Sequence, residues 1–237
     1  MNRDDAANGP ARVEAMCADQ LPAQPTRPIP GALPIRSAQP VPDPPLTLRS
    51  YPIQPTWPIE TPRLVLRPFV EDDLAAFHSY SRLNEVAQYL YWDPRDEVAS
   101  RAALELNMTR TGLREDGDGL VLAIVWREIG QVVGHSSLAL NSAIHRQGEV
   151  GFIVHPDHQG RGLATEAAQV MLRLGFENYH LHRIMARCDA RNLASAGVMK
   201  RLGMRQEAHF IHNEIFKGEW GDEFIYALLE DEWRARQ

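Results

Sequence analysis

Apolar and polar residues alternate, or form short apolar runs, along most of the chain after residue 58. Runs of this kind, bounded by glycine, proline and acidic residues, are typical of β-strands. They predict strands at residues 63–69, at two positions within residues 119–140 around a turn at 128–131, and at residues 148–154, 183–189, 205–216 and 220–229. The last two strands are joined by a Lys217-Gly218 turn and are expected to form a hairpin.

Between these strands, apolar residues recur at the three- and four-residue spacing of helices. Leu163, Ala167, Met171 and Leu174 fall on one helical face and predict a helix over residues 163–179. Further helices are predicted at residues 71–83, 96–113 and 192–204. The order β-α-α-β-β-β-α-β-α-β-β predicts a single α/β (α+β) domain with a mixed sheet of about six to seven strands, flanked by about four helices and without an internal repeat.

Residues 1–58 have a different composition from the rest of the chain. Of the 17 prolines, 14 lie at or before Pro62, and no helical or strand period is sustained before that point. Such a segment cannot bury enough apolar surface to offset the entropy cost of ordering it. We therefore expect residues 1–58 to form a proline-rich, largely disordered arm, followed by a folded domain over residues 59–237.

The charge distribution limits the class of partner. Basic and acidic residues balance within the arm, so the formal net charge of −6 resides in residues 59–237. This charge disfavours nonspecific binding to nucleic acid and suits a cationic substrate, although a mildly acidic surface is also ordinary for a soluble protein.

Cysteine usage and hydropathy predict where the protein is found. The two cysteines, Cys17 and Cys188, offer no disulfide framework, which fits a reducing compartment. The N-terminus lacks the layout of a secretory signal, and no apolar run is long enough to cross a bilayer. We expect a cytoplasmic protein that does not associate with membranes.

The stretch HPDHQGRGLATEA, residues 155–167, joins a predicted strand to a predicted helix through a loop with two glycines. The first amides of a helix lack partners within the helix, and the helix dipole adds partial positive charge there. Gly160 and Gly162 would let a phosphate approach the main chain, and Arg161 would add a full charge. An ordinary strand-to-helix turn is the alternative interpretation.

Two common phosphate-binding motifs do not fit this loop. No lysine followed by serine or threonine closes it, as a nucleoside-triphosphate loop would require. Glu166 or Thr165 stands where a dinucleotide-binding fingerprint would place its third glycine.

The residues VHPDHQGRGLA resemble the acetyl-CoA signature of the GNAT N-acetyltransferase superfamily, Q/R-x-x-G-x-G/A after a strand that ends in V-x-P. Gln159, Gly162 and Ala164 match its fixed positions. The likeness extends over about residues 58–233 and includes the segments IETPRLVLRPFVEDDL, GEVGFIV, RNLASAGVMKRLGM and KGEWGDEFIYALL. It is strongest to the RimJ/RimL branch, which acetylates protein α-amines and includes relatives that act on small amines. The arm has no counterpart in that pattern.

This resemblance implies a mostly antiparallel sheet with splayed central strands, between which the pantetheine of acetyl-CoA lies. The residues that it implies in cofactor binding are the strand residues Phe152, Ile153 and Val154, the loop and helix residues Gln159, Gly160, Arg161, Gly162, Leu163 and Ala164, and Asn192. A strand amide would also stabilise the oxyanion that forms when the amine attacks the thioester.

Amine acetylation needs a base for the ammonium group and an acid for the leaving thiolate. Glu149, three residues before the cofactor strand segment, is the candidate base, directly or through water; the alternative is a strand-edge glutamate paired with an arginine. Ser195 is the candidate acid by family likeness; the alternative is a helix-start serine bonded to the backbone. Tyr226 is a second candidate acid, although an aromatic residue there is more often part of the core.

The acceptor pocket has weaker candidates. Trp220 and Asp222 recur in the RimJ/RimL pattern, and Tyr91 and Trp92 occupy the region that forms the acceptor wall in this family; each also fits a packing role. The histidine pairs 155/158 and 180/182 lack companion ligands for zinc, so no metal is expected. Cys188 lies in an apolar run and is a poor candidate nucleophile.

Two hypotheses follow. The first is an enzyme that transfers acetyl from acetyl-CoA to a primary amine, with a protein N-terminal α-amine as the expected acceptor and an aminoglycoside or polyamine as the alternative. The second is a noncatalytic acyl-CoA-binding module. Neither involves nucleic acid, and a homodimer is one assembly that both leave open.

Overall fold

The computed structural model describes residues 55–237, so the predicted arm lies outside the described residues except for its last four positions. The described residues form one eight-stranded sheet in the order β1-β2-β3-β4-β5-β6-β8-β7. Its strands are β1 (Ile59–Glu60), β2 (Leu64–Arg67), β3 (Gly119–Trp126), β4 (Gln131–Ser142), β5 (Gln147–Val154), β6 (Arg183–Asp189), β7 (Arg205–Phe216) and β8 (Glu219–Leu229).

Six α-helices accompany the sheet in the described part of the chain. They are α1 (Leu74–Ser81), α2 (Asn84–Ala87), α3 (Glu97–Thr109), α4 (Leu163–Arg173), α5 (Leu193–Arg201) and α6 (Glu230–Arg234). Short 3₁₀ turns at Glu71–Asp73 and Pro156–His158 lead toward α1 and α4. Each of these helices is too short or too polar to cross a bilayer.

The predicted α/β class and mixed sheet are confirmed, with differences at the shortest elements. The strand β1 and the helices α2 and α6 were not predicted, because two to five residues are too few to show a period. The helix predicted over residues 163–179 is α-helical to Arg173 and continues as a π-helical turn over Leu174–Asn178. The helix predicted over residues 96–113 ends at Thr109.

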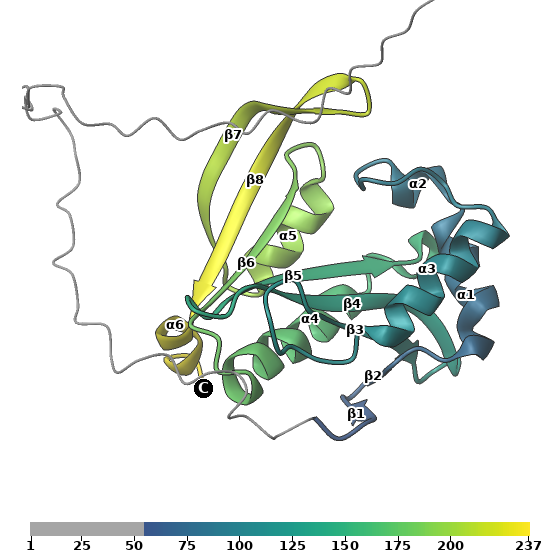
Figure 1. The fold of residues 1–237 in the computed structure, drawn as a ribbon, viewed down its shortest axis with the longest axis horizontal. Coiled ribbons are helices and arrows are strands. Elements are labelled where there is room, and N and C mark those ends of the chain that lie inside the picture. The colour runs from purple at the N-terminus through teal and green to yellow at the C-terminus, as the bar shows by residue number, and fades with distance from the viewer. Residues whose placement is uncertain (1–54) are drawn as a thin grey trace, which may run out of the picture. The chain divides into compact units, whose positions relative to one another are not determined.

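Two apolar clusters hold the sheet from its opposite faces. In β3, Leu122 and Ile124 belong to the cluster that contains Met171 of α4, whereas Val121 and Ala123 belong to the cluster around α1 and α3. Side chains alternate between the faces of a strand, so β3 is buried on both sides. Figure 1 shows α4 crossing β4 and β5, with α1 and α3 grouped near the other end of these strands.

One strand pair positions the site. Every neighbouring pair in the sheet is antiparallel except β5 and β6, which are parallel and connected through α4. Their pairing covers only Gln147–Glu149 against Arg183–Met185. Beyond it the strands separate, and in Figure 1 β6, β8 and β7 run at a steep angle to β3, β4 and β5. The predicted splay of the central strands is therefore present.

Candidate active site

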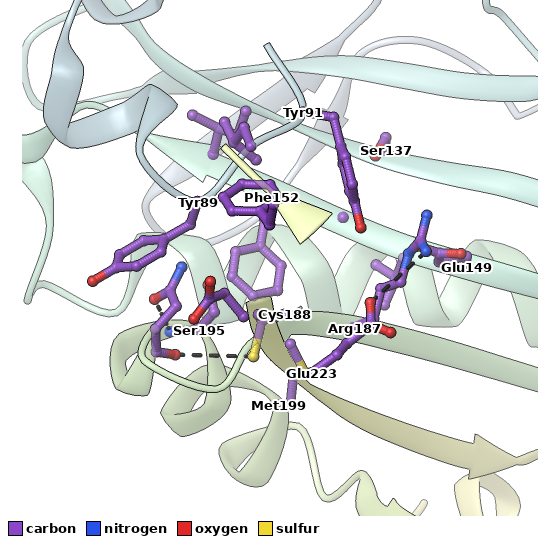
Figure 2. Close-up of a pocket in the computed structure, with 18 of the residues that line it drawn as sticks. Tyr89, Tyr91, Ser137, Glu149, Phe152, Arg187, Cys188, Ser195, Met199 and Glu223 are labelled. Atoms are coloured by element: carbon purple, nitrogen blue, oxygen red, sulfur yellow. Dashed lines mark hydrogen bonds and ion pairs between the residues drawn. The ribbon is translucent and has the colours of Figure 1, made fainter. Parts of the chain in front are cut away.

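A cavity of about 280 Å³ opens where β5 and β6 separate. Its walls come from residues 89–91, from β4 and β5, from the corner between β6 and α5, and from the β7–β8 hairpin. Figure 2 shows side chains from these segments converging on one space. Because the segments lie far apart in the sequence, the cavity depends on the splay of the sheet and not on any single loop.

Within residues 55–237, the edge of β5 beyond Glu149 has no strand partner on its β6 side. The other edge of β5 pairs with β4 along the strand, from Gln147 to Val154. Phe152 and Ile153, which the family resemblance implies in cofactor binding, line the cavity, while Val154 is buried and its carbonyl accepts a 2.9 Å hydrogen bond from Gln159 Nε2. An unpaired strand edge of this kind can bind an extended amide chain by adding it as a further strand.

The loop before α4 has the backbone that the two glycines predicted. Gly160 and Gly162 have φ values of +71° and +78°, and Gly162 is the N-cap of α4. No main-chain hydrogen bond joins the amides of residues 160–164 to the rest of the described chain. Several unpartnered amides at the positive end of a helix dipole form a site suited to a diphosphate.

Gln159 has a different place from the one predicted. Its amide donates to the carbonyl of Pro156 at 3.1 Å, and its side-chain amide donates to the carbonyl of Val154. Both bonds lie within the turn itself. Gln159 therefore shapes the loop and holds it against β5, and the amides open to a ligand begin at Gly160.

Side chains from the turn between β1 and β2 hold this loop in place. Arg63 donates from Nη1 to the carbonyl of Arg161 at 2.6 Å and from Nε to Glu166 at 2.7 Å. Glu166 also accepts from Thr61 Oγ1 at 2.6 Å. Burial opposes ionisation of Glu166, but the hydrogen bonds from Thr61 and Arg63 outweigh it and lower the pKa of this carboxyl. The Arg161 guanidinium lies 5.3 Å from the Trp126 ring centroid, in cation–π geometry.

Asn192 and Ser195 meet at the start of α5, on the other side of the cavity. Asn192 is the N-cap of α5, and its Oδ1 accepts from the Ser195 amide at 3.0 Å. Both residues line the cavity. The Ser195 hydroxyl makes no hydrogen bond within residues 55–237, so the predicted alternative of a serine bonded to the backbone does not describe it.

Glu149 lines the cavity and is also paired with an arginine. It therefore has features of both interpretations offered by the sequence, a candidate base and a glutamate paired with an arginine. Its Oε1 accepts from Arg187 Nε at 3.1 Å, and its Oε2 accepts from Asn141 Nδ2 at 3.3 Å. The Glu149 side chain is 27% exposed. A carboxylate held in this way keeps lone pairs directed to the cavity while its orientation is fixed.

Of the four acceptor-wall candidates, Tyr91 and Asp222 line the cavity and the two tryptophans do not. Trp220 is 60% exposed and stacks on His212. Trp92 packs against the core beside α1 and α3. Tyr226, the second candidate acid, is also outside the cavity: it is buried, and its hydroxyl donates to Gln206 at 3.1 Å.

Cys188 also lines the cavity, but its chemistry is unfavourable for nucleophilic attack. Burial raises the pKa of the Cys188 thiol to about 11, and the nearby Asp189 and Glu223 add to this effect. At neutral pH the thiol therefore remains protonated. No group of three or more potential metal ligands gathers anywhere in residues 55–237.

Comparison with known proteins identifies the family. Residues 63–205 match the model of the acetyltransferase (GNAT) domain. The chain belongs to the GNAT acetyltransferase family. It is 35% identical over 177 residues to the uncharacterized N-acetyltransferase YnaD of Bacillus subtilis, an alignment that covers 74% of this chain and 98% of YnaD. A GNAT acetyltransferase structure from Bacillus anthracis superposes with a TM-score of 0.66 at 31% identity, covering 73% of this chain and 99% of that one.

Relatives with named substrates fall into two groups. The spermidine N(1)-acetyltransferase of Escherichia coli is 24% identical over 170 residues, which is 72% of this chain and 88% of that protein. The [ribosomal protein uS5]-alanine N-acetyltransferase of E. coli is 31% identical over 84 residues, which is 35% of this chain and 43% of that protein.

As a GNAT family member, the chain is an N-acetyltransferase that uses acetyl-CoA. The residues present fit this co-substrate: the amides of residues 160–164 suit its diphosphate, and the unpaired edge of β5 suits its pantetheine amides. When bound, acetyl-CoA supplies the activated acetyl group.

Several cavity residues were missed by the sequence argument. Arg187 and Glu223 project into the cavity from β6 and β8, and Glu214 projects from β7. The sequence did contain a signal for Arg187. Charged residues recur at even spacing in this strand, at positions 183, 187 and 189, which indicates one polar face, whereas the whole strand was predicted to be buried. Glu214 and Glu223 carried no such signal, because charged residues on a terminal hairpin are common on exposed surfaces.

Proposed function

We propose that the enzyme acetylates a primary amine bound in the cavity between β5 and β8, with Glu149 as proton acceptor and Ser195 as proton donor. The observation that carries this proposal is that one cavity contains the Glu149 carboxylate, the unpaired β5 edge and the unbonded Ser195 hydroxyl. These are the three groups that amine acetylation requires from the protein.

The Glu149 carboxylate would remove a proton from the acceptor ammonium, directly or through one water molecule. Its bonds to Arg187 and Asn141 hold it in place for that transfer. The neutral amine would then attack the thioester carbon, while a β5 amide stabilises the negative charge on the thioester oxygen. Ser195 would return a proton to the departing thiolate.

The resemblance to the RimJ/RimL branch supports a protein N-terminal α-amine as acceptor. A second candidate is a small cationic amine, for two reasons. The cavity wall carries the carboxylates of Glu149, Glu214 and Glu223 near a single arginine, Arg187. In addition, the alignment with the spermidine acetyltransferase spans a much larger share of the chain than the alignment with the ribosomal-protein acetyltransferase.

Release of free CoA with a thiol reagent tests the proposal against a panel of N-terminal peptides, polyamines and aminoglycosides. We expect Glu149→Gln and Ser195→Ala to lower kcat for the best acceptor, Glu149→Gln by about 10²–10⁴-fold, the usual contribution of a general base. The dissociation constant of CoA should stay within about twofold of wild type for both variants. Glu105→Gln, on the exposed face of α3, is the matched control and should change neither kcat nor the dissociation constant of CoA.

Normal turnover in both variants would remove Glu149 and Ser195 from the mechanism. CoA binding without thiol release for any amine of the panel would contradict the proposed acceptor class.

A further inference from the structure

Glu223 is a largely buried carboxylate in the acceptor cavity to which the reaction outlined above assigns no role. It lies on β8 opposite Asp189 of β6, lines the cavity and is only 8% exposed. Figure 2 shows Glu223 beside Arg187, in the same part of the cavity as Glu149 and Tyr91 and away from Ser195. The cavity therefore has a charged end that is separate from the start of α5.

The hydrogen bonding of Glu223 is incomplete. Its Oε2 accepts from Asn213 Nδ2 at 3.0 Å. Its Oε1 accepts no hydrogen bond within residues 55–237, and the nearest cationic nitrogen, Nη1 of Arg187, lies 3.8 Å away. Oε1 is not among the fully buried polar atoms of the described chain, so it is reachable from the cavity and can accept a hydrogen bond from a bound molecule.

Arg187 forms an ion pair with Glu223 but is shared with a second carboxylate, so its single charge does not balance both. Its Nε is bonded to Glu149 at 3.1 Å, so one guanidinium serves two carboxylates. The third carboxylate at this end, Glu214, accepts a hydrogen bond from the neutral Tyr91 phenol at 2.5 Å. Burial raises the pKa of Glu223, and the charges of Glu214 and Glu149 raise it further against the opposing effect of Arg187.

Glu223 and Glu149 are placed to meet different parts of an acceptor. Glu149 stands on β5, next to the unpaired edge where the thioester is expected, whereas Glu223 stands two strands away on β8, across β6. Arg187 lies between the two carboxylates, as Figure 2 shows. A nitrogen poised for attack beside Glu149 leaves Glu223 available to another group of the same molecule.

We propose that Glu223 is a specificity-determining residue that binds a second positively charged group of the acceptor, so that the enzyme prefers small diamines to monoamines of equal length. This inference rests on the proposed function, in that the cavity is taken as the acceptor site. A second ammonium supplies the donor that Oε1 lacks and balances the surplus negative charge around Arg187.

The test compares two probes of equal length, 1,4-diaminobutane and 4-amino-1-butanol, by the kcat/KM of CoA release. The wild-type enzyme should prefer the diamine by at least about tenfold, the discrimination expected of one charge-assisted hydrogen bond. Glu223→Gln keeps the shape of the side chain and an oxygen for Asn213. It should reduce the preference to near unity by raising KM for the diamine, with the amino alcohol unaffected within about twofold.

Glu219→Gln is the matched control, because Glu219 lies on the same strand with its side chain 79% exposed. It should preserve the preference. The proposal is overturned if wild type does not distinguish the probes, or if Glu223→Gln impairs both probes equally, as a purely structural role would.

Calorimetry separates failure of this inference from failure of the proposed function. If no probe is acetylated, both are titrated into CoA-saturated wild type and Glu223→Gln. Tighter diamine binding in wild type that disappears in the variant supports the subsite even without turnover. Equal binding of the two probes to wild type rejects the subsite.

Discussion

Replacing Gly134 by alanine should disturb β5, the strand that we expect to bind the co-substrate, without changing any side chain of the cavity. Gly134 lies on β4 opposite Val154 of β5. A Cβ atom added there would lie 2.1 Å from the carbonyl oxygen of Ile153 and 2.9 Å from Cα of Val154. Both neighbours are main-chain atoms, so no side-chain rotation relieves the overlap. β4 and β5 must separate by roughly 1 Å before these atoms reach an ordinary contact distance.

The expected losses of stability and of CoA affinity follow from the overpacking and from the hydrogen bonds that the shift of β5 distorts. Overpacking of this size costs about 1–3 kcal/mol. For a domain of this length that corresponds to a fall in Tm of roughly 3–10 °C. A displacement of about 1 Å at Ile153 also moves the unpaired β5 edge away from hydrogen-bonding distance, so the Kd of CoA should rise about tenfold.

Differential scanning calorimetry and titration with CoA measure the two effects. Gly119→Ala is the matched control, since the Cβ there would lie no closer than 3.5 Å to any neighbour, the nearest being the flexible Arg110 side chain. That variant should stay within about 0.5 kcal/mol of wild type. A Gly134→Ala protein that melts within about 1 °C of wild type and binds CoA equally well would refute the argument from close approach.

Two further predictions concern charge. Arg63→Met removes the hydrogen-bond donor to the Arg161 carbonyl and the ion-pair partner of Glu166, so the Kd of CoA should rise several-fold. The free energy of unfolding at pH 7 should fall by less than about 1 kcal/mol, because Arg63 is half exposed. The pKa of Glu166 in the folded protein is lowered below 4.5, so the stability that its ion pair contributes is present above pH 4.5 and is lost as the pH falls through the lowered pKa. Urea denaturation measured over this pH range should show a weaker pH dependence for Arg63→Met than for wild type. An equal pH dependence in the two proteins would contradict a role of Arg63 in holding Glu166 and the loop. Burial, assisted by the charge of Arg95, lowers the pKa of His135 to about 4. Between pH 6.5 and pH 4 the unfolded chain therefore binds a proton at this residue more readily than the folded protein does. The free energy of unfolding should fall over this range by at most about 3 kcal/mol. NMR titration of the His135 ring should give a midpoint near 4, and a midpoint near 6.5 would show that the ring is not buried in solution.

The fold was predictable from the sequence because its periodic segments are long. The bounds of β6 and β7 agree with the predicted strands, and β8 differs by one residue at its start. The π-helical turn after Arg173 was not predictable from periodicity, since its five residues continue the apolar face of α4 with only a small change of phase.

The backbone of the loop before α4 was also predictable, because its determinants are local. Positive φ at Gly160 and Gly162 is a property of glycine and of the turn that contains it, so the motif carries its own geometry. The role of Gln159 was mistaken in detail: a polar residue in a motif was expected to offer its amide to a ligand, but both of its amides are used in closing the turn.

The acceptor half was not predictable, because its groups meet only in the folded sheet. The pairing of Glu149 with Arg187 spans two strands that are joined through α4, and the contact of Tyr91 with Glu214 joins segments 123 residues apart. Neither pair has a spacing that a sequence pattern could reveal. Asp222 lines the cavity, whereas Trp220, two residues earlier on the same face of β8 and nearer the hairpin turn, is 60% exposed.

The β7–β8 hairpin carries cavity carboxylates on strands that are separate from the β5 edge and from the loop before α4. The ladder between these strands is interrupted between Phe210 and Glu214, where His212 has a φ of +49° and its amide donates to Asp222 Oδ1 at 2.9 Å. This irregular segment carries Asn213, which holds Glu223 in the cavity. Changes of length or sequence there would move carboxylates at the acceptor end without touching the β5 edge or the loop before α4. If the acceptor binds as proposed, its specificity depends on the register of the terminal hairpin, whereas co-substrate binding depends on the splay of two central strands.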